Sequence, residues 1–131
     1  MTLVYLDSSI TVRAVLDVPE RARLRAWLDS AETTFVSSRL LRTEMIRVLR
    51  REDRPLSDAD PVLDRVGLID ITRDVHAVAE SIERHIRTLD ALHIATALLV
   101  GDNITMATHD SAMKAVAQSA GLEVNDPVAA L

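Results

Sequence analysis

Residues 3–9 read LVYLDSS, an apolar run of strand character that ends in an aspartate and two serines. Short runs of the same character recur at 33–36, 68–71, 104–107 and 122–124, and the segments between them carry apolar residues at helical spacing. Strands that alternate with helices need crossover connections, which align the strands in parallel and cover both faces of the sheet. We therefore expect an α/β fold, a three-layer α/β/α sandwich with a mostly parallel central sheet.

Helices are expected between these strands, and the weakest is expected at 56–66, where Pro61 interrupts the pattern. The others should cover 9–17, 19–30, 74–85, 88–100 and 111–120, with one more that runs to residue 51 from a cap at Ser37 or Ser38. All three glycines, Gly67, Gly101 and Gly121, lie where a helix could end. No linker or repeat divides the chain, so residues 1–131 should form a single domain.

The composition excludes several kinds of protein. The 131 residues are 48% hydrophobic, which is enough for a folded core. The chain has no cysteine, so disulfides, thiolate catalysis and cysteine-bound zinc are excluded. Its three aromatic residues are too few for a surface on which bases stack. No apolar run approaches the roughly 20 residues of a membrane span, and the N-terminal residues lack the features of a signal peptide. A cytoplasmic protein without membrane contact is therefore expected.

Several well-known nucleotide-binding and hydrolytic motifs are absent from the sequence. The chain has no G-x-x-x-x-G-K-[ST] loop, no G-x-G-x-x-G fingerprint, no G-x-S-x-G elbow and no H-E-x-x-H pair. Its four histidines, His76, His85, His93 and His109, show no metal-ligand spacing. We interpret them as surface or packing residues.

Four carboxylates lie near strand ends or on adjoining helices. Asp7 directly follows the first strand, and Asp110 lies three residues beyond the end of the fourth. Asp90 belongs to the first turn of the helix before the fourth strand, and Glu44 borders the buried stripe of the helix after the second. Because parallel sheets bind ligands outside the carboxyl ends of their strands, these four side chains are expected to converge there.

Each of these carboxylates also has a structural interpretation. Asp7 and Asp110 could cap the helices that follow them, Asp90 could complement a helix dipole, and Glu44 could pair with arginines of its own helix. If the four converge, they raise one another's pKa unless a cation lies among them. Hard oxygen ligands select Mg²⁺ or Mn²⁺, and an ion of that kind suits the hydrolysis of a phosphodiester bond by water.

The distribution of charge allows an RNA substrate despite the net charge of −5. Without the four carboxylates the net charge would be −1, so most of the acidity could lie in one pocket. Residues 39–54 contain six arginines against three acids, a local balance of +3. This stretch is either a solvated helix face or a surface that binds RNA phosphates, and Arg39 and Arg42 are its candidate RNA contacts.

Five short segments recur together in a known family. The most specific is LDALHIATA at 89–97, and the others are LDSS at 6–9, TEMIRVLRR at 43–51, THD at 108–110 and GLEVNDP at 121–127. In this order and spacing the segments resemble the PIN domain, and within it the VapC-type toxins of bacterial toxin–antitoxin pairs. The resemblance covers nearly the whole chain.

The resemblance implies a function and a set of residues. The implied site is an acidic quartet that binds Mg²⁺ or Mn²⁺, with two supporting residues: Asp7, Glu44, Asp90 and Asp110, then Thr108 as a polar neighbour and Ser8 as a helper. The implied activity is that of an endoribonuclease in which a metal-activated water attacks the phosphorus. A homodimer is also implied, as is silencing by a cognate VapB-type antitoxin whose C-terminal segment covers the site.

Two other functions fit parts of the pattern. A PIN-like protein could bind RNA or an antitoxin with little turnover, and only an assay separates it from a nuclease. A receiver-like signalling module has similar length and alternation, but it needs an acidic pair after the first strand and a lysine after the last. Asp7 follows its strand without an acidic partner, and the sole lysine, Lys114, lies within an expected helix.

Overall fold

The computed structural model describes residues 2–30, 32–101 and 103–129. Within these residues, five strands form one sheet in the order β3-β2-β1-β4-β5, and every neighbouring pair is parallel. The strands are β1 (Thr2–Leu6), β2 (Thr33–Ser38), β3 (Val66–Ile69), β4 (Ile104–Ala107) and β5 (Glu123–Asn125). The α/β class and the parallel central sheet expected from the sequence are therefore confirmed.

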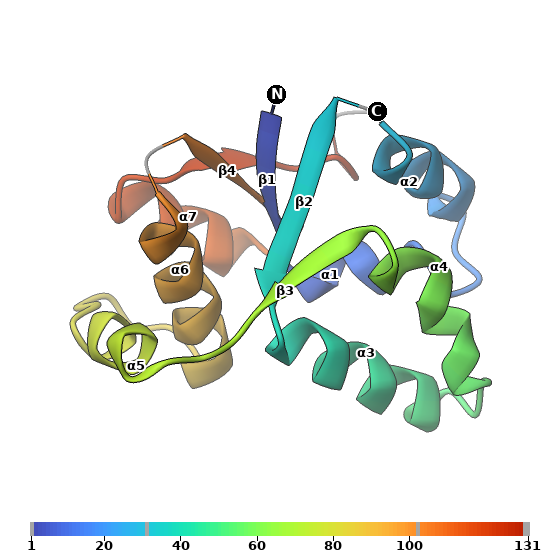
Figure 1. The fold of residues 1–131 in the computed structure, drawn as a ribbon, viewed down its shortest axis with the longest axis horizontal. Coiled ribbons are helices and arrows are strands. Elements are labelled where there is room, and N and C mark those ends of the chain that lie inside the picture. The colour runs from blue at the N-terminus through green and yellow to red at the C-terminus, as the bar shows by residue number, and fades with distance from the viewer. Residues whose placement is uncertain (1, 31, 102, 130–131) are drawn as a thin grey trace.

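Helices cover both faces of this sheet (Figure 1). One face carries α1 (Ser8–Thr11), α2 (Arg21–Leu28), α3 (Leu40–Arg51) and α4 (Asp60–Leu63), with a short 3-10 helix at Leu56–Ala59 before α4. The other face carries α6 (Thr88–Val100) and α7 (Ser111–Ser119), and α5 (Arg73–Glu80) packs against α6. In the described part of the chain, no helix is both long and apolar enough to cross a membrane.

The central strand β1 contributes to both apolar cores. Val4 and Leu6 belong to the core beneath α1–α4, whereas Tyr5 belongs to the core beneath α6 and α7. Side chains alternate between the two faces of a strand, and all three residues are at most 5% exposed. Burial on both faces fixes the register of β1, because a slip by one residue would exchange the two faces. The position of Asp7, the next residue, is fixed with it.

The carboxyl ends of β1 and β4 lie side by side where the strand order reverses. Leu6 is in register with Ala107, and the Asp7 N–H donates a hydrogen bond to the Ala107 carbonyl at 3.0 Å. From β1 the chain moves outward to β2 and β3 on one side, and it then returns to β4 and β5 on the other. The crevice at such a switch point is the usual ligand site of an open α/β sheet.

The helix expected at 9–17 is wrong in length, because α1 is helical only over Ser8–Thr11. The β-branched residues at 10–12 lose side-chain freedom in a helix, which weakens it there. The Ala14 carbonyl accepts a hydrogen bond from Arg25 Nε at 2.7 Å. In a longer α1 this carbonyl would accept a helical hydrogen bond from a backbone N–H. Here it accepts one from the Arg25 side chain of α2 instead.

The third strand begins two residues earlier than the expected 68–71. Val66 is buried and pairs with Phe35 of β2, which extends the sheet in that direction. Gly67 consequently lies inside β3 and does not end a helix. The other two glycines do follow helices, α6 and α7, and both have positive φ angles.

The helix expected at 74–85 corresponds to α5, which ends at Glu80. The residues that follow are not helical, and Ile82 and Ile86 pack against the core formed by β1, β4, α6 and α7. Here a tertiary contact overrides the local helical pattern.

Asp126 anchors the segment after β5. Its Oδ2 accepts hydrogen bonds from His109 Nδ1 at 2.9 Å and from Lys114 Nζ at 2.5 Å, and its Oδ1 accepts from the N–H groups of Val128 and Ala129. Burial raises the pKa of Asp126, but the hydrogen bonds from Lys114 and His109 outweigh burial and hold this pKa at about 2. The ionised carboxylate therefore joins the C-terminal segment to α7 and to the loop before it.

We expect Asp126→Asn to lower the free energy of unfolding at pH 7 by about 2 kcal/mol. Folding lowers the pKa of Asp126 from 3.8 to about 2. The carboxylate therefore stabilises the fold above about pH 4, and this contribution disappears as the pH falls toward about 2. Urea unfolding of both proteins across this range measures the difference. The control Asp64→Asn, at an exposed position, should show no such pH dependence. A difference in the free energy of unfolding that stays constant with pH would contradict a stabilising role for the Asp126 charge.

Candidate active site

A cleft of about 670 Å³ lies at the carboxyl ends of β1 and β4, where α3 and the start of α6 form its walls. The four predicted carboxylates, Asp7, Glu44, Asp90 and Asp110, all line this cleft together with Ser8. Asp7 and Asp110 come from the loops after β1 and β4, Glu44 comes from α3, and Asp90 comes from the first turn of α6. The structure therefore brings the four side chains to one place.

Two hydroxyl groups orient the Asp7 carboxylate. Its Oδ2 accepts hydrogen bonds from Ser9 Oγ at 2.7 Å and from Thr108 Oγ1 at 2.8 Å, and Asp7 is only 4% exposed. Asp7 precedes α1, but its side chain makes no capping hydrogen bond. The capping interpretation is therefore wrong for this carboxylate.

The same hydroxyls connect the loops that follow β1 and β4. Ser9 Oγ accepts a hydrogen bond from the His109 N–H at 2.9 Å, and Thr108 Oγ1 accepts one from the Asp110 N–H at 3.1 Å. Thr108, which the resemblance implies as a polar neighbour of the acids, lies beside Asp7. Ser9 is an additional partner of Asp7 that sequence reasoning missed. Its position in the first turn after the strand was the available signal.

Arg87, just before α6, bridges two of the acids. Its Nε donates to Asp90 Oδ2 at 3.0 Å, and its Nη2 lies 3.5 Å from Asp110 Oδ2. Asp110 also caps α7, because its Oδ1 accepts a hydrogen bond from the Met113 N–H at 2.8 Å. Asp110 therefore both caps α7 and lines the cleft.

The charges of Asp7 and Asp110 act on Asp90 in this cleft. Burial raises the pKa of Asp90, Arg87 opposes this rise, and the negative charges of Asp7 and Asp110 add to it. The hydrogen bond to Asp90 raises the pKa of Arg87, as do the charges of the three aspartates. Around Asp90, three negative charges thus lie beside one bridging guanidinium, an arrangement that favours the binding of a cation at these three aspartates.

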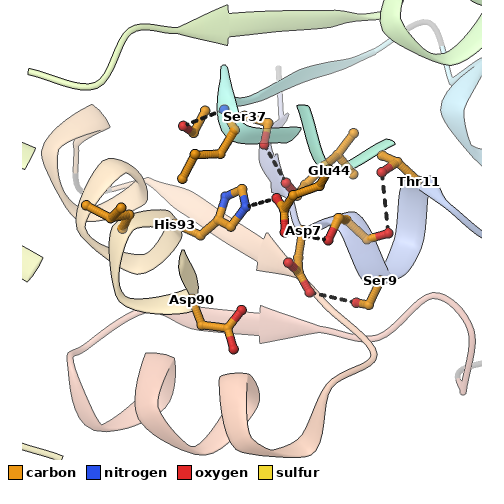
Figure 2. Close-up of polar contacts among 12 residues, drawn as sticks. Asp7, Ser9, Thr11, Ser37, Glu44, Asp90 and His93 are labelled. Atoms are coloured by element: carbon orange, nitrogen blue, oxygen red, sulfur yellow. Dashed lines mark hydrogen bonds and ion pairs between the residues drawn. The ribbon is translucent and has the colours of Figure 1, made fainter. Parts of the chain in front are cut away.

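Glu44 points toward α6, and the described residues show no ion pair between it and the arginines of its own helix (Figure 2). Its Oε1 lies 2.5 Å from His93 Nε2, and its Oε2 accepts a hydrogen bond from Ser8 Oγ at 3.2 Å. Its side chain is 21% exposed, so the carboxylate still reaches the cleft. The surface-pair interpretation of Glu44 is therefore wrong.

His93 is a site residue that sequence reasoning missed, because it was interpreted as a surface or packing residue. It is completely buried, and its Nδ1 lies 2.6 Å from the Tyr5 hydroxyl. Burial raises the pKa of Tyr5 well above its usual value of 10, so Tyr5 remains a neutral phenol. The available signal was the three-residue spacing from Asp90, which puts both side chains on one side of a helix.

The donor set suits a hard divalent cation. Carboxylates and hydroxyls are the oxygen ligands that Mg²⁺ and Mn²⁺ prefer, and the mutual repulsion of the aspartates gives a reason to bind one. Within the described residues, no three acidic or histidine side chains already form a ready metal-binding cluster. Asp7, Asp90 and Asp110, with Glu44 beside them, are the acids of the cleft that could hold such an ion.

Arginines line the cleft, but they are not the two singled out from the sequence. Arg47 and Arg51 of α3 line it, as do Arg13 and Arg87. The predicted RNA contacts lie elsewhere: Arg39 is 3.7 Å from Asp70, and Arg42 lines a neighbouring pocket that adjoins the cleft along α3. The signal for Arg47 and Arg51 was helical spacing, because residues three and seven positions after Glu44 share its face.

The chain is similar to known proteins over most of its length. A family model for the PIN domain matches residues 4–119. Ribonuclease VapC46 of Mycobacterium tuberculosis is 32% identical over 130 residues, which cover 97% of this chain and 99% of that protein. Ribonuclease VapC47 of the same species is 28% identical over 132 residues, which cover 95% of this chain and 97% of that protein.

Solved structures share the fold at low sequence identity. VapBC2 from Rickettsia felis, bound to a DNA fragment from its promoter, matches with a TM-score of 0.75 and 18% identity over 95% of this chain and 98% of that one. VapC20 of Mycobacterium tuberculosis, a toxin that cleaves the sarcin–ricin loop, matches with a TM-score of 0.70 and 16% identity over 91% of this chain and 95% of that one.

We expect Arg87→Gln to raise the pKa of Asp90 above its value in the unmodified protein. Burial and the neighbouring aspartates raise this pKa, and the variant removes the guanidinium that opposes them. Carbon-13 NMR of the side-chain carboxyl groups across a pH series measures the change. The control Arg84→Gln removes a guanidinium that donates to a backbone carbonyl, so the Asp90 titration should stay the same. An unchanged titration in Arg87→Gln would show that Arg87 does not screen Asp90.

Proposed function

This chain belongs to the PIN-domain family, and we propose that it is a divalent-metal-dependent endoribonuclease that acts as the toxin of a toxin–antitoxin pair. The observation that carries the proposal is the cleft in which Asp7, Asp90 and Asp110 act on one another's charge beside Glu44. Relatives of nearly equal length that are named ribonucleases support the same activity.

The three aspartates would hold Mg²⁺ or Mn²⁺, directly or through water, and Glu44 would hold a water or a second ion. When bound, such an ion supplies Lewis acidity, which lowers the pKa of a water and offsets negative charge on the phosphate.

The chain's own residues prepare the site for this chemistry. Ser9 and Thr108 hold the Asp7 carboxylate in one orientation, so it needs little rearrangement on binding. In the free protein, Arg87 balances the charges of Asp90 and Asp110. Glu44 faces the cleft and is the group that would accept a proton from the attacking water.

Positive side chains at the cleft would bind the RNA backbone. Arg47 and Arg51 lie one turn apart on α3 and line the same cleft as the carboxylates. Guanidinium groups suit phosphate because they donate two hydrogen bonds in a fixed plane. Arg39 and Arg42 would contact only RNA that extends beyond the cleft.

The proposed partner is a VapB-type antitoxin that covers the cleft. Apolar side chains, among them Val12, Leu40, Val48 and Leu89, line it beside the acids. Leu89 is 48% exposed, so its apolar surface at the cleft is open to a partner. A homodimer, the usual assembly of the family, is part of the same proposal.

We expect Mg²⁺ or Mn²⁺ to raise the melting temperature by several degrees relative to EDTA. A ligand at 100 times its Kd stabilises a protein by about 2.7 kcal/mol. For a domain of this size, a change of that free energy shifts the melting temperature by several degrees. Asp7→Asn and Asp90→Asn should melt higher than the unmodified protein in EDTA, because each removes a repelling charge, and should gain little from metal. Calorimetry with and without each ion measures these shifts.

Both variants should also lose RNA cleavage by about 100-fold or more. The control Asp74→Asn, exposed on α5, should keep the cleavage rate and the metal response of the unmodified protein. Full cleavage by either site variant would contradict the nuclease assignment. An unmodified protein that cleaves no RNA and ignores both ions would favour a PIN-like binding protein with little turnover.

We expect the double variant Arg47→Gln/Arg51→Gln to bind single-stranded RNA more weakly, with a smaller dependence on salt. Each lost phosphate contact should reduce the slope of log K against log salt by about 0.7 to 1. Fluorescence anisotropy with a labelled random RNA, in an Asp90→Asn background that prevents cleavage, measures the slope. The matched control Arg39→Gln/Arg42→Gln should bind like its parent. Equal losses in both double variants would mean that total charge, and not the cleft, determines binding.

A further inference from the structure

A buried histidine connects several elements of the candidate site. His93 is 0% exposed and lies three residues after Asp90 on α6. Its Nε2 is 2.5 Å from Glu44 Oε1, and its Nδ1 is 2.6 Å from the Tyr5 hydroxyl. Figure 2 shows the His93 ring directed at the Glu44 carboxylate, with Asp7 and Asp90 nearby. The ring therefore joins α6, α3 and β1 through two short hydrogen bonds.

The hydrogen bonds to Glu44 and to Tyr5 together indicate which nitrogen of His93 carries the proton. A carboxylate can only accept, so the ring proton of a neutral His93 lies on Nε2, which donates to Glu44. Nδ1 is then unprotonated and can accept the Tyr5 proton. The Tyr5 oxygen itself accepts a hydrogen bond from the Ser38 N–H at 3.1 Å. In this arrangement each donor in the series from Ser38 through Tyr5 and His93 to Glu44 meets an acceptor.

We propose that His93 is a positioning residue whose Nε2–H fixes the Glu44 carboxylate at the cleft, and that Tyr5 selects the His93 tautomer that makes this bond. The inference rests on the proposed function, because the task of Glu44 there is to hold water or an ion. Full burial keeps His93 away from substrate, so it acts only through Glu44.

The second oxygen of Glu44 is also held. Ser8 Oγ donates to Oε2 at 3.2 Å, so both carboxylate oxygens have a protein donor. Partners of this kind orient a ligand or a base, and their loss typically costs about 10- to 100-fold in metal affinity or activity. Because Asp90 and His93 lie on one side of α6, this helix presents one acid itself and positions a second from α3.

Two substitutions of His93 separate positioning from packing. Gln carries an amide N–H at about the reach of Nε2, whereas Asn is shorter and reaches only the position of Nδ1. We expect His93→Asn to lower kcat by about 10- to 100-fold, with little change in the KM for RNA, because the buried side chain does not touch substrate. His93→Gln should restore most of kcat. Titration calorimetry with Mn²⁺ alone should show weaker binding to the Asn variant than to the Gln variant.

Nitrogen-15 NMR of the histidine rings tests the tautomer without RNA or metal. The unmodified protein should show His93 protonated at Nε2 and not at Nδ1. Tyr5→Phe keeps the aromatic ring and removes only the hydroxyl, so it tests the proposal even if the histidine variants do not fold. This variant should show a mixture of tautomers and a reduced kcat.

Three results would overturn the proposal. They are a ring protonated at Nδ1, a His93→Asn variant with unchanged kcat and Mn²⁺ affinity, and a His93→Gln variant as impaired as His93→Asn. Failure of the proposed function would look different. A protein that cleaves no RNA, but has the Nε2–H tautomer and loses Mn²⁺ affinity in His93→Asn, would support the positioning of Glu44 and contradict the nuclease assignment.

Discussion

The repulsion among Asp7, Asp90 and Asp110 is the constraint on which the rest of the site depends. Burial raises the pKa of Asp90, and the negative charges of Asp7 and Asp110 add to this rise. The surrounding residues offset this cost locally: hydroxyl groups bind Asp7, and Arg87 bridges the other two. The parallel sheet creates the constraint in the first place, because it sets the ends of β1 and β4 side by side.

Much of the fold could be predicted because its strands and helices follow local patterns. Both α6 at 88–100 and β4 at 104–107 have the expected boundaries. The errors occur where contacts from distant residues decide the structure. Arg25 binds the Ala14 carbonyl beyond the end of α1, Phe35 pairs with Val66 so that β3 begins two residues earlier, and Ile82 packs on a core beyond the end of α5. None of these contacts leaves a periodic signal in its own segment.

The acids of the site could be predicted, but their partners could not. A carboxylate directly after a strand indicates a position at the sheet edge, so Asp7 and Asp110 follow from topology alone. His93 sits in an apolar stretch, and nothing local shows that Glu44, 49 residues earlier, lies against it. For Arg39 and Arg42 the sequence showed the local excess of positive charge. The charge excess alone did not show which face of α3 the cleft occupies; Glu44 marks that face, and Arg47 and Arg51 share it.

The start of α6 shows why stability alone does not explain this sequence. Residues 90–97 are all buried, yet they include Asp90, His93 and Thr96. A buried polar group destabilises the fold unless it is hydrogen-bonded. Thr96 meets this need within its own helix, through the Leu92 carbonyl at 2.7 Å. Asp90 and His93 depend on Arg87 and on Glu44, so their burial is tolerated only while the cleft keeps its geometry. An apolar residue at position 93 would need no partner, and the use of histidine there is best explained by the carboxylate that it holds.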